Sequence, residues 1–210
     1  ADAQPLLVPS GDEKSRYRDI IMLEPHNQRW LYALESMIEY EGQLVVTREM
    51  QLLTRNKVLD VMSYSLRSDT NARNLGLFEP ERRKNLALPA GLNKETVAFA
   101  GSLFREADYD HRMYINKVLQ HFAENEYSYT LNPPLLGENA MDDFLFGTRL
   151  GFCEHYASAF VVLMRAAGIP SRIVIGYQGG SMHPFDDYMI VRQSDAHAWA
   201  EVWLENEGWV

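Results

Sequence analysis

Apolar and polar residues follow two different patterns along this chain, and the pattern changes near residue 73. Between residues 16 and 68, short apolar runs are separated by polar stretches such as EPHN and TRNK. Runs of this length between turn signals are typical of β-strands. The pattern predicts four or more short strands in a small antiparallel sheet or sandwich, after an extended, weakly ordered leader at residues 1–12. The stretch LYALESMIEY, residues 31–40, also fits a helical turn.

Helices are predicted in the second half of the chain. Residues 111–126 carry apolar residues three and four positions apart, and Asp110 stands where an N-cap is expected. Residues 94–107 form a second predicted helix, with Asn93 as its N-cap. Both segments therefore predict amphipathic helices of ordinary length.

The most apolar helix is predicted at residues 154–167, where apolar residues cover nearly the whole circumference. A helix of this kind is buried, and Gly168 and Pro170 end it. The stretch before it, residues 133–152, has no periodicity. Loops of that length inside a compact domain tend to be functional. The sequence thus predicts a functional loop that leads into a buried helix.

Three further strands are predicted after this helix, at RIVIGY, DYMIVRQ and AHAWAEVWLE. The tetrapeptide ENEG, residues 205–208, fits a hairpin loop that places Leu204 opposite Trp209. Together these patterns divide the chain into three parts: a β-rich N-terminal domain at residues 1–75, a linker or boundary at 76–92, and a mixed α+β core at 93–210.

Composition limits the classes of partner. The formal net charge is −9 and the pI about 5.1, whereas phosphate binding needs a surplus of Lys and Arg, so nucleic acid is excluded as the main partner. No apolar run approaches the roughly 18 residues expected of a membrane span, and from the sequence we expect no signal peptide within this chain. Because the chain opens with Ala1 rather than Met, we expect it to be a processed or excised portion of a longer protein.

The candidate chemistry centres on Cys153, the only cysteine in the chain. A lone cysteine is more often a small buried hydrophobe than a reactive group. Cys153, however, stands where a helix begins, and the N–H groups and dipole at that position favour a thiolate. The long preceding loop also indicates that the sulfur lies at a cleft. A nucleophilic thiol then needs a base that titrates near neutral pH.

A histidine is the expected base. His155 lies two positions after Cys153 on the same helix, so the two side chains diverge by about 200° around the axis. His197 begins a strand whose alternation groups it with Trp199 and Glu201, opposite a face of small residues. Spacing alone does not select it, because Cys–His partners adjoin in space rather than in sequence. The other histidines are weaker candidates by their setting: His26, His111, His121 and His183.

No metal or cofactor is expected. One cysteine and scattered histidines give no metal-ligand spacing. The acidic pairs Asp142-Asp143 and Asp186-Asp187 are interpreted as solvated loop charges, which leaves calcium dependence open.

The second half of the chain carries four short motifs at a specific spacing. They are Cys-x-x-Tyr-Ala from Cys153, Arg-Ala-x-Gly-Ile-Pro-x-Arg from Arg165, Gly-Tyr at 176–177 and His-Ala-Trp-x-Glu-Val from His197. This set closely resembles the transglutaminase-like core, and the nearest resemblance is to large bacterial membrane-anchored proteins with an extracytoplasmic catalytic domain. The resemblance covers about residues 86–210, and LEPHNQRWLYALE resembles the stretch preceding the core in that group.

This resemblance implies a fold and a reaction. The fold is α+β and papain-like, with the cysteine at the start of a central helix on an antiparallel sheet, after a small β-rich domain. Cys153 is then the nucleophile and His197 its base, in acyl transfer from protein glutamine side chains to an amine or to water through a thioester. The Cys153 N–H is a natural oxyanion donor, and a second donor stays unassigned.

The resemblance also implies partners and a location. The partners are proteins or peptides that carry glutamine and an amine acceptor, with no metal or cofactor. The location is periplasmic or extracytoplasmic, as a domain of an inner-membrane protein whose membrane segment lies outside this chain.

The third member of the family's triad is an Asp on the strand after the histidine. In the expected hairpin, the positions opposite His197 and Ala200 fall beyond Val210. The sequence therefore predicts a core truncated before its last strands and impaired as an enzyme. Asp195 and Glu201 are poorly placed to substitute, since Asp195 lies about 6.6 Å along the strand from His197.

Two other functions stay open at this point. The same Cys–His pair suits a cysteine peptidase or amidase, because the outcome depends on whether an amine or water reaches the thioester. A non-catalytic protein-binding module is the second alternative, and the intact Cys153 and His197 argue against it. Three tryptophans fit a core role as well as a cleft wall and are left out of the site: Trp199, Trp203 and Trp209.

Overall fold

The structure is a computed structural model that describes residues 7–210. Contacts between residues divide the chain into two compact units. The first contains the residues up to Gly76 together with Asn206–Trp209, and the second contains Leu77–Glu205 together with Val210.

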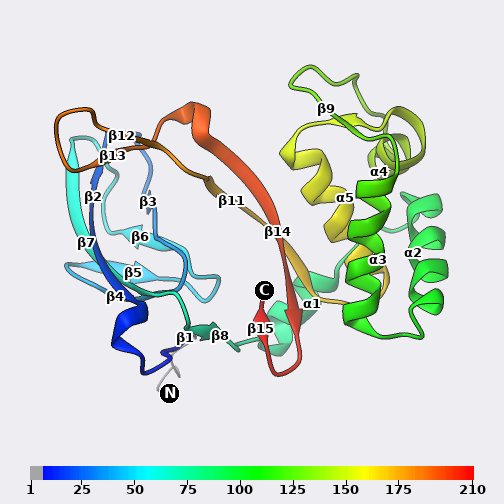
Figure 1. Ribbon diagram of the computed structural model, residues 1–210, viewed down its shortest axis with the longest axis horizontal. Helices are drawn as coiled ribbons and strands as arrows, with labels where there is room; N and C mark the ends of the chain where they lie inside the picture. The colour runs from blue at the N-terminus through cyan, green and yellow to red at the C-terminus, as the bar shows by residue number, and fades with distance from the viewer. Residues whose placement is uncertain (1–6) are drawn as a thin grey trace. The chain divides into compact units, whose positions relative to one another are not determined.

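The first unit is built from short antiparallel strands (Figure 1). They are β1 (Leu7–Val8), β2 (Arg16–Leu23), β3 (Trp30–Leu31), β4 (Met37–Tyr40), β5 (Leu44–Val46), β6 (Leu52–Thr54), β7 (Met62–Asp69), β8 (Arg73–Asn74) and β15 (Gly208–Trp209), with a 3-10 turn η1 (Glu13–Ser15). Two three-stranded sheets have the orders β2-β7-β4 and β3-β6-β5, and β1 pairs with β8. The β-rich prediction for this region is confirmed.

The stretch 31–40 resolves as strand rather than helix. Ser36 has a positive φ of 56°, so the chain turns there and enters β4. Met37 then packs with Leu52, Tyr64 and Leu66 in the core of this unit. The helical-turn alternative is therefore wrong, because a single left-handed residue redirects the backbone before a helix could form.

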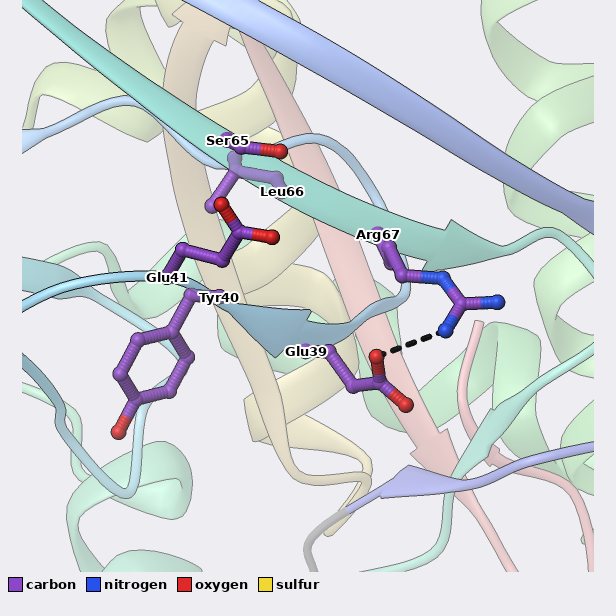
Figure 2. Close-up of a pocket in the computed structure, with 6 residues that line it drawn as sticks. All are labelled: Glu39, Tyr40, Glu41, Ser65, Leu66 and Arg67. Atoms are coloured by element: carbon purple, nitrogen blue, oxygen red, sulfur yellow. Dashed lines mark hydrogen bonds and ion pairs between the residues drawn. The ribbon is translucent and has the colours of Figure 1, made fainter.

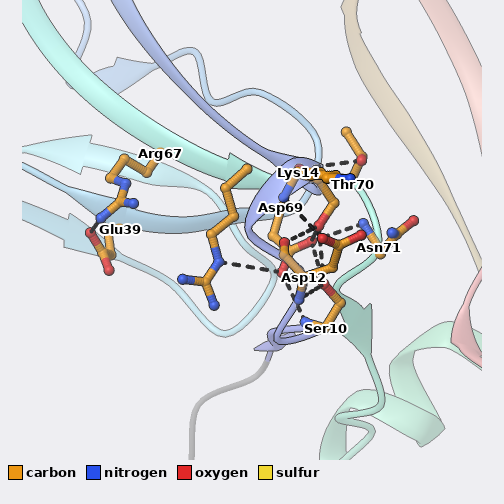
Figure 3. A network of polar contacts seen from close by, with 10 residues as sticks. Ser10, Asp12, Lys14, Glu39, Arg67, Asp69, Thr70 and Asn71 are labelled. Carbon is orange, nitrogen blue, oxygen red and sulfur yellow. Dashed lines mark hydrogen bonds and ion pairs between the residues drawn. The ribbon is translucent and has the colours of Figure 1, made fainter.

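The start of the described chain is fastened to the end of β7 (Figure 3). The Asp69 carboxylate is fully buried and accepts hydrogen bonds from Ser15 Oγ (2.7 Å), Ser10 N–H (2.8 Å) and Asn71 N–H (3.0 Å). These donors, with Ser15 contributing most, lower the pKa of Asp69 to about 2. Residues 7–12 therefore form an ordered strand and turn, and the prediction of a weakly ordered leader is wrong for these residues. Residues 1–6 lie outside the described part of the chain.

The second unit surrounds one buried helix, α5, with further helices and a small sheet (Figure 1). Its helices are α1 (Glu79–Leu86), α2 (Lys94–Glu106), α3 (His111–Glu124), α4 (Ala140–Asp142), the π-helix η2 (Asp143–Thr148), α5 (Cys153–Ala166) and the 3-10 turn η3 (Gln193–Asp195). Its strands are β9 (Ser128–Tyr129), β10 (Leu150–Gly151), β11 (Ser171–Tyr177), β12 (Ser181–Met182), β13 (Met189–Ile190) and β14 (Ala196–Leu204).

Helix α5 is buried as predicted. Leu163 and Met164 are fully buried, and the Tyr114 hydroxyl of α3 donates a hydrogen bond of 2.8 Å to the Leu163 carbonyl. Gly168 adopts φ 80°, and the Ile169 N–H bonds back to the Met164 carbonyl at 3.0 Å. This is the Schellman closure that a glycine at this position permits.

One predicted N-cap is confirmed and one is wrong. Asp110 accepts a hydrogen bond of 2.7 Å from the Met113 N–H at the start of α3. Asn93 adopts a left-handed conformation and its side chain does not cap α2. The cap comes instead from Asp142, which accepts from the Thr96 N–H (2.7 Å) and hydroxyl. Asp142 is therefore a structural carboxylate rather than a solvated loop charge.

The stretch 133–152, predicted as a loop without structure, contains α4, η2 and β10. Phe144 and Leu145 of η2 are fully buried. A π-helix turns more slowly than an α-helix, so its apolar residues do not show the 3.6-residue repeat. For this reason the segment carries no recognisable pattern in the sequence.

Helix α1 lies inside the segment interpreted as a linker, with Pro80 in its first turn. Its end is tied to α5, because Arg165 donates from Nη1 to the Ala87 carbonyl at 2.9 Å. The same guanidinium donates to the Ser171 carbonyl through Nη2 at 2.8 Å. A single arginine thus joins α1, α5 and the start of β11.

In the sheet that supports α5, β11 and β14 pair antiparallel from Ser171↔Val202 to Tyr177↔Ala196. The hairpin after β14 differs by one residue from the prediction. Val202 and Val210 exchange two backbone hydrogen bonds of 2.9 Å, so Leu204 is not opposite Trp209. Asn206 and Gly208 both adopt positive φ, and this tighter turn sets the shifted register.

Candidate active site

Cys153 is the first residue of α5 and is partly exposed. Backbone pairing fixes the chain immediately before it, because β10 runs parallel to β9 with Gly151 opposite Tyr129. Within residues 7–210, the N–H groups of Cys153 and Glu154 have no hydrogen-bond acceptor. A helix start with free N–H groups next to a thiol favours negative charge at that point. The Glu154 N–H is thus a candidate for the second oxyanion donor that the sequence left unassigned.

His197 is the second residue of β14 and pairs with Gly176 across the sheet. The alternation expected from the sequence is present: Ala198 and Val202 are buried, and His197 and Glu201 are partly exposed on the other face. Helix α5 packs on the face of Val202, since the Ser171 hydroxyl, on that same face, donates to the Val161 carbonyl at 3.1 Å. By this alternation, His197 belongs to the face that α5 does not cover.

The start of α5, which carries Cys153, and the start of β14, which carries His197, nevertheless lie at the same end of the second unit (Figure 1). Ser171 contacts Val161 of α5 and lies opposite Val202 of β14, so the helix and the strand meet there. Cys153 lies eight residues before Val161 in α5, which is about 12 Å along the helix axis. From Val202, β14 runs back five residues to His197, about 17 Å, in the same direction. Within the described chain no hydrogen bond joins their side chains. Free enzymes often tighten such bonds only with substrate bound, so the Cys–His pair stays a prediction.

The remaining histidines occupy structural or exposed positions. His121 Nε2 lies 3.0 Å from the Tyr127 hydroxyl, and burial, with the charge of Arg149 as a smaller cause, lowers the pKa of His121. His183 Nδ1 lies 3.0 Å from Asp186 Oδ2 in the loop before β14. His111 is exposed at the start of α3, and the His26 ring stacks on Trp30 at 4.2 Å.

His155 has a role at the helix start rather than as a base. Its Nδ1 accepts a hydrogen bond of 3.4 Å from the Phe152 N–H. Sequence reasoning missed this contact, although a residue three positions after an N-cap often bonds back to it. The spacing of Phe152 and His155 is that of a capping box, but histidine is not the residue usually found at this position.

Neither carboxylate near His197 in the sequence orients it. Asp195 accepts from the Arg192 N–H at 2.7 Å. Glu201 forms an ion pair with Arg172 on the adjacent strand, with contacts of 2.6 and 2.8 Å. Both carboxylates are thus engaged elsewhere, as the sequence led us to expect.

Trp199 and Trp209 lie in different surroundings. A side chain at Gly176 would come within 3.0 Å of the Trp199 indole, so this ring covers the residue opposite His197. Trp209 Nε1 donates to the Gly76 carbonyl at 3.2 Å and belongs to the first unit.

A shallow pocket in the first unit is not a second active site (Figure 2). Its charged groups pair with each other or with a neighbour: Arg67 contacts Glu39 at 2.9 Å, and Glu41 contacts Arg18 at 2.9 Å. Among the described residues no group of three metal-ligating side chains occurs. No helix between residues 7 and 210 is long and apolar enough to cross a membrane.

The second unit combines a thiol at the start of a buried helix with an antiparallel sheet that carries a histidine. This combination indicates the class of protein to which the chain belongs. Residues 98–210 match the transglutaminase-like superfamily, and the chain belongs to this family. The fold expected from the resemblance is therefore confirmed.

Two relatives and one solved structure give the particulars. The chain is 39% identical over 193 residues to the protein-glutamine gamma-glutamyltransferase of Pseudomonas aeruginosa, covering 91% of this chain and 29% of that protein. It is 35% identical over 103 residues to the uncharacterized protein YebA of Bacillus subtilis, covering 46% of this chain and 14% of that protein. The crystal structure of the periplasmic domain of TgpA from P. aeruginosa, bound to ethylmercury, superimposes with a TM-score of 0.91 at 36% identity, covering 97% of this chain and 72% of that chain.

Proposed function

We propose that this chain carries a cysteine-dependent acyltransferase site that acts on protein-bound glutamine and forms a thioester on Cys153. The proposal is supported chiefly by the position of Cys153 at the start of α5, next to free N–H groups, in a member of the transglutaminase-like superfamily. The name of the P. aeruginosa relative supports glutamine as the acyl donor. The chain spans 29% of that relative's length, so the activity of the whole protein is part of the proposal.

The reaction proceeds in two transfers. His197 takes the proton of the Cys153 thiol, and the thiolate attacks the carboxamide carbon of glutamine. The oxyanion forms beside the Cys153 N–H. The imidazolium protonates the amide nitrogen as the C–N bond breaks, and ammonia leaves. An amine such as lysine then attacks the thioester, gives up a proton to His197, and displaces the thiolate to form the new amide.

Cys153 is the only thiol in the chain, so every thioester adduct can be assigned to it. The assay couples a biotinylated primary amine to a glutamine-bearing protein and follows intact mass. We expect Cys153→Ala to abolish both amine incorporation and the hydroxylamine-sensitive acyl adduct. His197→Gln should lower the rate by about 10²–10⁴-fold. His111→Gln, at an exposed histidine of the same unit, is the matched control and should keep the wild-type rate.

Alkylation of the thiol by iodoacetamide at pH 6 tests the same pair without a substrate. A thiolate supported by His197 should react faster than in His197→Gln at this pH. Equal rates in wild type and His197→Gln would refute His197 as the base and favour a non-catalytic module.

A hydrolase of the same fold is the second candidate function, since water can replace the amine. Peptide cleavage without amine incorporation would favour it. The third triad member is also part of the proposal: an Asp on a strand after β14 would orient His197.

We also propose a periplasmic location for this chain, as a domain of a membrane-anchored protein. The similarity to the periplasmic domain of TgpA supports it. Fusion to a reporter that is active only outside the cytoplasm, made with the full-length parent, tests it.

A further inference from the structure

We propose that His155 is a positioning residue for the nucleophile: its imidazole closes the first turn of α5 by accepting the Phe152 N–H, and so sets the direction in which Cys153 and the free N–H groups point. This inference rests on the proposed role of Cys153. It gives a function to a histidine that cannot itself act as the base.

The hydrogen bonds of the backbone entering α5 show why a side chain is needed there. The Arg149 carbonyl accepts from Ser128 N–H at 2.9 Å, and the Gly151 carbonyl accepts from Thr130 N–H at 2.8 Å, which fixes the chain on β9. The next amide, that of Phe152, is past the end of this ladder. It donates to His155 Nδ1 at 3.4 Å. A backbone N–H at a helix entry needs such a partner.

His155 is the third residue of α5, and Phe152 is the residue before the helix. A side chain at this third position can bond back to the N-cap backbone N–H, usually as Glu or Gln. Here an imidazole occupies the position. Because Nδ1 accepts, His155 must be unprotonated at Nδ1 with its hydrogen on Nε2.

The imidazole is held in place from three sides. Its ring makes an edge contact with Phe152, with centroids 4.5 Å apart, and a tilted contact with Phe144 of η2 at 5.7 Å. On the third side is Gly151. A β-carbon on Gly151 would lie 2.6 Å from the Cβ of His155 and 3.0 Å from the ring of Phe144.

Gly151 is therefore a glycine for steric reasons rather than conformational ones. Its φ is not positive, so alanine would be free to adopt the backbone conformation. The Cβ and Cγ of His155, together with the Phe144 ring, exclude a side chain at this position. A Gly151→Ala substitution should push His155 away from the Phe152 N–H and reproduce the effect of removing the ring.

The hydrogen bond between Phe152 and His155 also leaves the N–H groups on either side of the Cys153 sulfur free. With the Phe152 N–H satisfied by His155, the unpaired N–H groups within residues 7–210 at this helix start are those of Cys153 and Glu154. These two flank the sulfur. Loss of the His155 bond would let the first turn fray, and a displacement of about 1 Å can cost on the order of 100-fold in rate.

The first test compares three variants of the full chain by iodoacetamide alkylation of Cys153 and by hydrogen exchange of the Phe152 amide. His155→Ala should lower the alkylation rate about tenfold or more and speed exchange of this amide. His155→Gln, whose amide oxygen can reach back as Gln does in capping boxes, should restore most of both. Gly151→Ala should match His155→Ala. His111→Ala is the control and should change neither.

The outcomes separate this inference from the proposed function. Unchanged exchange and alkylation in His155→Ala would overturn it, and so would equal losses in His155→Ala and His155→Gln, which would assign the ring a packing role only. Absence of amine incorporation in wild type would overturn the proposed function and leave the exchange result standing.

A measurement on the unmodified protein covers the case in which His155→Ala does not fold. Nitrogen NMR of the His155 ring should show the hydrogen on Nε2 and a bare Nδ1 at neutral pH. A hydrogen on Nδ1 would overturn the inference, because that nitrogen could not then accept the Phe152 N–H.

Discussion

The two units of this chain reach stability by different means. The first has a small core, of which Leu52 and Leu66 are nearly fully buried members, and adds a buried carboxylate network around Asp69. The second has a larger core around α5, in which Leu163 and Met164 are fully buried. A short-stranded sheet buries little apolar surface per residue, so polar fastening matters more there, whereas a helix buried on most sides is stabilised mainly by packing.

The largest expected effect is on core leucines. Leu163→Ala in the second unit and Leu66→Ala in the first should each destabilise the chain by about 2–5 kcal/mol, through lost transfer energy and the cavity left behind. If the two units unfold independently, each variant shifts only one unfolding transition. Calorimetry, with Cys153 alkylation reporting the second unit, checks this. A single transition shifted by both would contradict it.

The next effect concerns Asp69. Its pKa is lowered to about 2 from 3.8, so its contribution is present above pH 4 and is lost as the pH falls toward 2. We expect the midpoint of unfolding of the first unit to fall over this range. Asp69→Asn should lower the midpoint of unfolding of the first unit at neutral pH, by less than Leu66→Ala does. It should also make this midpoint less dependent on pH between pH 4 and 2. An unchanged acid slope in Asp69→Asn would show that another group titrates.

The two units also contain ion pairs of different exposure. The side chains of Arg172 and Glu201 are 19% and 23% exposed, whereas those of Arg67 and Glu39 are 45% and 59% exposed. Glu201→Gln should cost about 1–3 kcal/mol, because it removes charge-assisted hydrogen bonds in a partly buried site. Glu39→Gln should cost less than about 1 kcal/mol and lose its effect in high salt. Denaturant titrations at two salt concentrations measure both.

The smallest expected effects come from two tyrosine hydroxyls. In the first unit, Tyr64 donates to the Tyr32 carbonyl at 2.8 Å and accepts from the Tyr32 N–H at 3.1 Å. In the second, Tyr114 makes one bond, to Leu163. At about 1 kcal/mol per hydrogen bond, Tyr64→Phe should cost about twice as much as Tyr114→Phe.

The ionisation of the same hydroxyls gives a second measurement. Burial raises the pKa of Tyr64 to about 12 and that of Tyr114 further still. Both phenols should therefore stay protonated until the chain unfolds in alkali, which absorbance titration follows. Ionisation of either near its usual pKa would contradict the burial described here.

Local sequence patterns predicted most of the second unit, and the exceptions depend on features that a local pattern does not show. The periodicity of α5, the Asp110 cap and the β14 alternation all depend on residues close in sequence. The cap of α2 does not: Asp142 reaches Thr96 across 46 positions. Likewise η2 lacks the 3.6-residue repeat, and the hairpin register depends on positive φ at Asn206, which spacing does not reveal.

The candidate site was predicted by resemblance more than by pattern. The thiol at a helix start follows from the local sequence, but the choice of His197 among six histidines needed the family motifs. His155 could be rejected as a base from helical geometry alone. Its bond to the Phe152 N–H required coordinates, because a capping interaction by imidazole has no strong sequence signature.

The attachments of α5 are unevenly spread along its length. From Val161 onward, side chains of Tyr114, Arg165 and Ser171 bond to its carbonyls or to the strand that follows. Its first turn depends on aromatic contacts and one weak bond. Local opening favours the least fastened segment. On warming, the end of α5 that carries Cys153 should therefore loosen first, and the proposed activity should be lost several degrees below the loss of the fold.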